Sequence, residues 1–153
     1  MLLTGLLPDI STDPAIETAT DSIEAGRSGT IVAPVGIRPP LLAAVATRAA
    51  TPLVVLTATG RDAETLTNAL ASWIPGVAML PAWETLPHER LSPQVDTMAR
   101  RIAVLRRLVH PVAGDESAGP ISVLVVPIRA FLQPIISGLA DLEPVRVRTG
   151  DIL

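Results

Sequence analysis

Residues 80–109 read LPAWETLPHERLSPQVDTMARRIAVLRRLV, and this stretch joins a buried strand to an amphipathic helix. The short apolar run 77–80 leads into a charged loop over residues 81–90 that two prolines stiffen. Ser92 followed by Pro93 offers a hydroxyl N-cap and a first-turn proline, so we expect the helix to begin there. The apolar residues expected to form its buried stripe recur three or four positions apart: Val95, Met98, Ile102, Leu105 and Val109.

Charged residues are distributed along this helix as helix electrostatics favour. Asp96 precedes Arg100 by four residues, which is the better orientation for an ion pair on one helix face. Three cations fall at the carboxyl end, where they suit the helix dipole: Arg106, Arg107 and His110. We expect three arginines to form a solvated face: Arg100, Arg101 and Arg107. The more specific alternative is that these arginines contact a protein or a phosphate.

Apolar runs bounded by glycine and proline alternate with helical patterns along the chain. Strands are expected at residues 30–33, 52–57, 77–80 and 121–126. Helices are expected from Asp13-Pro14 and over 41–50, 62–73, 92–109 and 129–136. The strands are continuously apolar, which is typical of a parallel sheet covered by helices on both faces, so we expect an α/β fold. Residues 145–148 alternate instead, which indicates an edge strand or the entry to another domain.

Composition argues against several classes of function. The 153 residues are enough for a domain with a core, and the net charge of −3 gives no global basic field for nucleic acid. The chain has no cysteine, so neither disulfides nor thiol chemistry arise. No apolar run approaches the ~18–20 residues that cross a bilayer, so we expect a cytoplasmic protein without a membrane partner.

The turn over residues 33–40 lies where a phosphate loop would come after the first expected strand. Such a loop needs glycines for close backbone approach, a lysine for the terminal phosphates and a Ser or Thr for magnesium. This turn has Gly36 alone, the chain has no lysine, and Pro39 and Pro40 lack the amides that would donate. Arg38 could meet an anion, although a surface salt bridge is the simpler assignment. We therefore predict that the chain binds no ATP and has no cofactor.

The loop after residue 80 carries an acid–base set, Glu84, His88 and Glu89, but lacks the groups that would complete a site. No nucleophile and no second histidine at ligand spacing accompany these residues, so we predict neither a catalytic residue nor a metal site. Trp83 is better explained as a core plug than as a partner anchor. The loop is therefore expected to be architectural first.

The central motif resembles that of the bacterial transcription-repair coupling factors (Mfd). Residues 83–87 (WETLP), then SP at 92–93, Asp96 and Arg101, are similar to a distinctive loop and helix of that family. Residues 125–134 (VVPIRAFLQP) resemble the family's next strand and helix. The order of strands and helices matches over nearly the whole chain, whereas the first thirty residues match only in type.

The resemblance implies a RecA-like domain, a three-layer sandwich with a mainly parallel sheet, similar to the excision-repair protein UvrB but with a degenerate phosphate loop. It implies that residues 1–28 form an amino-terminal helical segment and that residues 29–143 form the RecA-like domain. Residues 144–153 would begin the next domain, which in the family binds UvrA. The family's ATP-dependent motor, RNA polymerase-binding and DNA-translocating domains would lie elsewhere in the parent chain.

We interpret the chain as a catalytically silent scaffold that supports recruitment of nucleotide excision repair proteins to stalled RNA polymerase and autoinhibition of the parent translocase. One alternative is a nucleotide- or phosphate-binding enzyme domain that uses the Gly36 turn. Another is an interaction module that docks a protein through residues 83–90. The residues expected to be structural or partner-facing are Trp83, Glu84, Thr85, Pro87, His88, Arg90, Ser92, Pro93, Asp96, Arg100 and Arg101.

Overall fold

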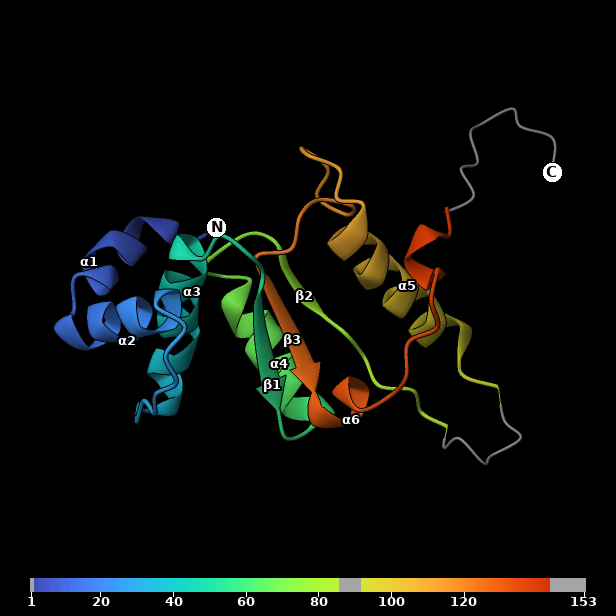
Figure 1. Cartoon of the computed structure of the whole chain (residues 1–153), viewed down its shortest axis with the longest axis horizontal. Coiled ribbons are helices and arrows are strands. Elements are labelled where there is room, and N and C mark those ends of the chain that lie inside the picture. The colour runs from blue at the N-terminus through green and yellow to red at the C-terminus, as the bar shows by residue number, and fades with distance from the viewer. Residues whose placement is uncertain (1, 86–91, 144–153) are drawn as a thin grey trace.

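Three parallel strands form an open sheet at the centre of the molecule (Figure 1). The computed structural model describes residues 2–85 and 92–143. The strands are β1 (Leu53–Thr57), β2 (Val77–Met79) and β3 (Val123–Pro127), in the order β1-β3-β2. Val125 of β3 aligns with Val55 on one side and with Met79 on the other. The expected α/β class with a parallel sheet is confirmed.

Helices lie on both sides of this sheet (Figure 1). They are α1 (Leu7–Ser11), α2 (Pro14–Glu24), α3 (Arg38–Arg48), α4 (Gly60–Leu70), α5 (Val95–Val109) and α6 (Ile128–Phe131). Single 3-10 turns occur at Thr4–Leu6, Val35–Ile37 and Leu139–Asp141. The expected helices over 41–50, 62–73 and 129–136 are present with shifted ends, the last of them reduced to four residues.

Alternate residues of β3 divide the interior into two cores, as the period of a strand requires. Val123 and Val125 pack with α3 and α4 in a first core, which also holds Ala43, Ala46, Ala63, Leu70 and Ile74. Leu124 and Val126 pack in a second core on the opposite face, with Val104 of α5. The resulting helix–sheet–helix layering is consistent with a RecA-like sandwich.

The amino-terminal helices pack mainly on α3, and Leu7 of α1 also joins the first core. Asp13 caps α2 by accepting a hydrogen bond from the Ala15 amide at 2.8 Å, and Pro14 takes the first turn, as expected. Ile16 of α2 packs against Leu41 and Ala44 of α3 in a small separate cluster. Helix α3 therefore carries apolar residues on two sides.

The predicted strand at residues 30–33 is wrong for this structure. Residues 27–34 have no regular secondary structure, and Val32 is 95% exposed. The run is apolar, but a strand needs a neighbouring ladder for its backbone groups, and none of the described strands pairs with it.

The predicted start of α5 is also wrong, and its predicted buried stripe holds only in part: Leu105 is buried and Ile102 is half-buried. The helix begins at Val95 with Gln94 as its N-cap, so Ser92 and Pro93 lie outside it. Val95 is 80% exposed, and Met98 and Val109 are exposed as well. The residues buried on α5 are Thr97, Arg101, Val104 and Leu105. The true buried face includes polar residues, which an apolar stripe cannot reveal.

One face of β1 is left uncovered, contrary to the expectation that helices cover both sides. Val54 is 51% exposed and Leu56 is 48% exposed. They align with Leu124 and Val126 of β3, which belong to the second core. Helix α5 therefore covers this face of β3 but leaves the same face of β1 exposed.

Gly76 sets the entry to β2 and has no room for a side chain. Its φ is +74°, and its carbonyl accepts hydrogen bonds from the amides of Ser122 (2.8 Å) and Val123 (3.3 Å). A Cβ at this position would lie 2.8 Å from Ser122 Oγ and 2.9 Å from the Pro120 carbonyl oxygen. Both left-handed backbone and close approach therefore require glycine here.

We expect Gly76→Ala to lower the free energy of unfolding by about 2–4 kcal/mol, because it adds overpacking to left-handed strain. Gly114→Ala is the matched control, since Gly114 has φ +82° but no atom within 4 Å of the added Cβ. Gly114→Ala should lower the free energy of unfolding by only about 1 kcal/mol. Urea unfolding of both variants measures the difference, and equal losses would show that the close approach to Ser122 costs nothing.

Candidate functional site at the carboxyl edge of the sheet

The three parallel strands end at one edge of the sheet, where ligands of open α/β folds bind. The turn after β1 leads into α4, the loop after β2 carries Trp83, and α6 comes directly after β3. Segments far apart in the sequence thus meet at this edge (Figure 1). It is the natural place for a site.

The backbone of Trp83 is held by a side chain fifty residues away. The Trp83 amide donates to Gln133 Oε1 at 2.8 Å, and Gln133 Nε2 donates to the Trp83 carbonyl oxygen at 3.4 Å. One amide side chain therefore satisfies both backbone groups of Trp83, as a neighbouring strand would. This pair fixes the loop after β2 to the chain beyond α6.

Glu84 joins the same loop to α5 and α6. Its carboxylate accepts a hydrogen bond from the Thr97 hydroxyl on α5, and its carbonyl oxygen accepts one from Arg129 Nη2 at 3.1 Å. The Thr97 hydrogen bond, and after it one from the Glu84 backbone amide, holds the pKa of this carboxyl below its usual value. Glu84 is therefore ionised and internally bonded near neutral pH, although its side chain is at the surface.

Arg101 is the largest fully buried side chain among the described residues, with 1% exposure. Its guanidinium carbon lies 4.5 Å from the centre of the Trp83 ring, and Nη1 donates to the Pro81 carbonyl oxygen at 2.6 Å. No ion pair joins it to a carboxylate of residues 2–85 or 92–143, and its Nε has no partner there. Burial lowers the pKa of Arg101. The prediction that Arg101 is solvated is wrong.

We name this set of interlocked residues the Trp83 junction; it comprises Trp83, Glu84, Thr97, Arg101, Arg129 and Gln133. The sequence pattern pointed to Trp83, Glu84 and Arg101. It did not point to Thr97, because a lone threonine on a helix carries no signal. Arg129 and Gln133 lie in the stretch that resembles the family, which gave no hint of what they bond.

The remaining predicted site residues lie outside the contacts that define the junction. Asp96 and Arg100 form the expected ion pair at 2.8 Å, with both side chains exposed. Thr85 and Pro93 are half-buried and Ser92 is exposed. Arg107 is not simply solvated, since its Nε donates to the Gly119 carbonyl oxygen at 2.8 Å. The predicted residues Pro87, His88 and Arg90, with Glu89 and the strand at 145–148, lie outside the described residues.

A crevice of about 490 Å³ lies beside the junction at the same edge. Two arginines and two glutamates line it: Arg100, Arg129, Glu64 and Glu84. The start of α4 lies there too, but Thr59 Oγ1 already accepts a hydrogen bond from the Asp62 amide at 3.1 Å. The Thr59 hydroxyl also bonds the Asp62 carboxylate at 2.7 Å. The Thr59 hydroxyl and the Asp62 amide at the start of α4 are therefore bonded within the chain.

The turn at Gly36 does not have the geometry of a phosphate-binding loop. It is a 3-10 turn, Val35–Ile37, whose residues are all exposed. A Cβ on Gly36 would meet no atom within 4 Å, so no close approach requires glycine here. Ile37 precedes α3 without any side-chain cap.

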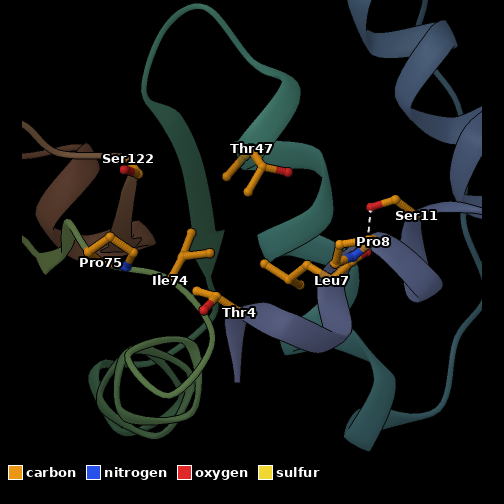
Figure 2. Close-up of a pocket in the computed structure, with 9 residues that line it drawn as sticks. Thr4, Leu7, Pro8, Ser11, Thr47, Ile74, Pro75 and Ser122 are labelled. Carbon is orange, nitrogen blue, oxygen red and sulfur yellow. Dashed lines mark hydrogen bonds between the residues drawn. The ribbon is translucent and has the colours of Figure 1, made fainter. Parts of the chain in front are cut away.

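A second cavity of about 430 Å³ lies near the amino ends of the strands, between α1, α3 and the Ile74-Pro75 segment (Figure 2). Leu7, Pro8 and Ile74 give it apolar walls. Its Ser11 hydroxyl donates to the Leu7 carbonyl oxygen at 2.7 Å and is therefore used internally (Figure 2). Among the residues that the structure describes, no titratable side chain lines this cavity.

Metal-ligand clusters and membrane-spanning helices are both missing from the described part of the chain. Within residues 2–85 and 92–143, no three His, Cys, Asp or Glu side chains gather as metal ligands would. No helix in these ranges has the length and hydrophobicity needed to cross a membrane.

Most of this chain is similar in sequence to known proteins. The chain is 47% identical over 124 residues to the transcription-repair-coupling factors of Mycobacterium bovis and Mycobacterium tuberculosis. It is homologous to transcription-repair-coupling factors. The aligned part is 80% of this chain and 10% of each coupling factor, so the chain spans about a tenth of those relatives. No protein-family model matches the chain. The resemblance inferred from the motif is confirmed.

We expect Trp83→Ala to lower the free energy of unfolding by about 2–4 kcal/mol, because the half-buried ring also covers a buried cation. In a double-mutant cycle with Arg101→Met, the two changes should couple by about 1–2 kcal/mol. Trp73→Ala is the matched control: Trp73 is also half-buried, but it packs on the first core and should be additive with Arg101→Met. Additivity of the Trp83 pair would contradict the stacking role of Arg101.

The lowered pKa of Glu84 predicts a pH dependence of stability. A carboxyl whose pKa is lower in the folded than in the unfolded chain stabilises above the unfolded value, and this contribution disappears as pH falls through the folded value. The Glu84→Gln variant should therefore be less stable than the unsubstituted chain at pH 7, and this difference in stability should be smaller at pH 3. Urea midpoints of both chains at the two pH values test this. Asp96→Asn, at the exposed ion pair, is the control. A Glu84→Gln deficit that is independent of pH would contradict the ionised Thr97 bond.

Proposed function

We propose that this chain is a catalytically silent scaffold domain of a transcription-repair coupling factor. One observation carries the proposal: the motif residues that mark the family are bonded to other parts of the same domain. Trp83 and Glu84 bind Gln133, Thr97 and Arg129, and Trp83 covers Arg101. These groups are therefore used to hold the domain together rather than to engage a substrate.

The absence of catalysis is supported by the chemistry of the two places where a nucleotide would bind. The Gly36 turn has a single glycine and no lysine, which is what a degenerate Walker A loop of a UvrB-like domain would retain. The crevice beside α4 is lined by the carboxylates of Glu64 and Glu84, which would repel a nucleotide's phosphates. ATP and magnesium would then be needed only by the motor domains of a cytoplasmic parent translocase.

The carboxyl end of α5 suggests how the scaffold presents the next domain of the parent chain. His110 Nε2 lies 2.7 Å from Asp141 Oδ1, and Arg106 reaches Glu143 at 3.7 Å. Arg106 also donates to the Leu142 carbonyl oxygen at 3.2 Å. These bonds fasten the end of the RecA-like domain (residues 29–143) to the helix whose other end lies in the Trp83 junction. The segment from residue 144 onward would begin the domain that recruits UvrA, so its attachment point would be set by α5.

On this proposal, this chain alone should show no measurable binding to UvrA at micromolar concentration. A parent chain extended through the next domain should bind UvrA with sub-micromolar affinity, as measured by biosensor titration. Trp83→Ala in the extended chain is the control that separates scaffold from docking module. The scaffold predicts unchanged affinity at a temperature where the variant is folded. Equal, tight binding by both chains would place the UvrA site within these residues and contradict the proposal.

The alternative of a nucleotide-binding domain predicts a different result from the same material. Mg-ATP would then give saturable heat in calorimetric titration of this chain at micromolar concentration. The scaffold predicts no heat above dilution. Contacts with RNA polymerase, DNA and the repair machinery, and any autoinhibitory contact, would be made by or through the other domains of the parent chain.

A further inference from the structure

The segment over residues 132–143, which follows α6, is attached to the domain at two places. Near its start, the Gln133 side chain bonds both backbone groups of Trp83. At its end, the 3-10 turn Leu139–Asp141 lies against α5 (Figure 1). Between these two anchors, residues 134–138 form no helix or strand and are all exposed. The segment is therefore held at its ends and not along its length.

The two anchors differ in how much apolar surface they bury. The first lies next to α6, whose Ala130 is 1% exposed and belongs to the second core. The second anchor contains no buried residue: Leu139 and Ala140 are half-buried, and Leu142 is exposed. Burial of apolar surface is the dominant favourable term in folding, and segments with little of it open locally at low cost. The second anchor should therefore open more readily than the first.

Charged side chains supply the specific contacts of the second anchor. His110 Nε2 lies 2.7 Å from Asp141 Oδ1, and Arg106 Nη2 lies 3.7 Å from Glu143 Oε1. Arg106 Nη1 also donates to the Leu142 carbonyl oxygen at 3.2 Å. The side chains of Asp141 and Glu143 are 66% and 84% exposed, so water and dissolved ions compete for them. Such contacts orient the segment against α5 but hold it weakly.

Gly138 provides a turn about which the end of the segment can move. Its φ is +82°, and its carbonyl oxygen accepts a hydrogen bond from the Asp141 amide at 3.1 Å. A Cβ at position 138 would meet only Asp141 Oδ2, at 4.0 Å, so the rest of the domain does not enclose the turn on that side. Residues 138–141 therefore form a local unit that can leave α5 without losing its own hydrogen bond.

We propose that residues 139–143 form a clasp that opens by itself, about Gly138, while the Trp83 junction and both cores stay intact. In its closed form, the clasp fixes the direction in which the chain leaves α5. In its open form, that direction is free although the domain remains folded. The clasp is a property of the contacts described above and does not depend on the proposed scaffold function.

Thiol labelling tests whether the clasp opens separately from the core, because the chain has no cysteine of its own. Leu139→Cys places a single thiol at the clasp, and Ala130→Cys places one in the second core. Iodoacetamide should label the thiol at position 139 at least about tenfold faster than the thiol at position 130. Equal labelling rates at the two positions would show that the clasp opens only together with the core and would overturn the proposal.

Removing the carboxylates of the clasp tests whether its charges hold it closed. Asp141→Asn with Glu143→Gln, added to Leu139→Cys, should speed labelling at position 139 by about threefold or more. The same pair added to Ala130→Cys should leave labelling and the urea midpoint unchanged. Asp9→Asn with Glu17→Gln is the matched control, since it changes the net charge equally at exposed carboxylates of α1 and α2.

The control pair should leave the labelling rate at position 139 unchanged. Salt at about 0.5 M should speed labelling there in the chain with both clasp carboxylates, and have little effect once they are removed. Equal effects of the two double variants, or no effect of Asp141→Asn with Glu143→Gln, would overturn the proposal. So would an acceleration at position 130 as large as that at position 139, because the core would then open with the clasp.

Discussion

The carboxyl edge of the domain depends on the contacts that compensate the buried guanidinium of Arg101. Removing a cation from water is expensive, and here no described carboxylate offsets the cost. The face of Trp83 and the carbonyl of Pro81 supply the compensation. Both compensating groups lie on the loop after β2, so this loop cannot leave α5 without exposing or stranding the charge. That constraint explains why a tryptophan and an arginine eighteen positions apart belong to one motif.

The other contacts of the Trp83 junction extend this constraint to the rest of the sheet. Gln133 and Arg129 tie the same loop to the chain beyond β3, and Thr97 ties it to the start of α5. Beneath these polar bonds, β3 supplies both cores at once, because its alternate residues face opposite helices. Polar bonds therefore determine how the loops are arranged, while aliphatic packing supplies the adhesion between layers.

Helix α5 connects the Trp83 junction to the chain beyond α6. Helix α5 carries Thr97 near its amino end, and His110 at its carboxyl end meets Asp141. A helix of fifteen residues thus connects the motif loop to the segment at residues 141–143. Such a connection suits a scaffold domain, which is the function that we propose for this chain.

The sequence by itself determined the class of fold, because continuous apolar runs separated by helical patterns indicate a parallel sheet whatever the details. It also predicted the Asp96–Arg100 pair and the cap of α2, since both depend only on residues within one helix turn. Tertiary structure alone decided that Arg101 is buried and that α5 turns Thr97 inward. It also decided that residues 30–33 lie outside the described sheet. Those outcomes depend on partners 13 to 20 residues away or on a neighbouring strand. Local periodicity records the preference of a segment for burial, but the partners that bury it are set by packing across the whole domain.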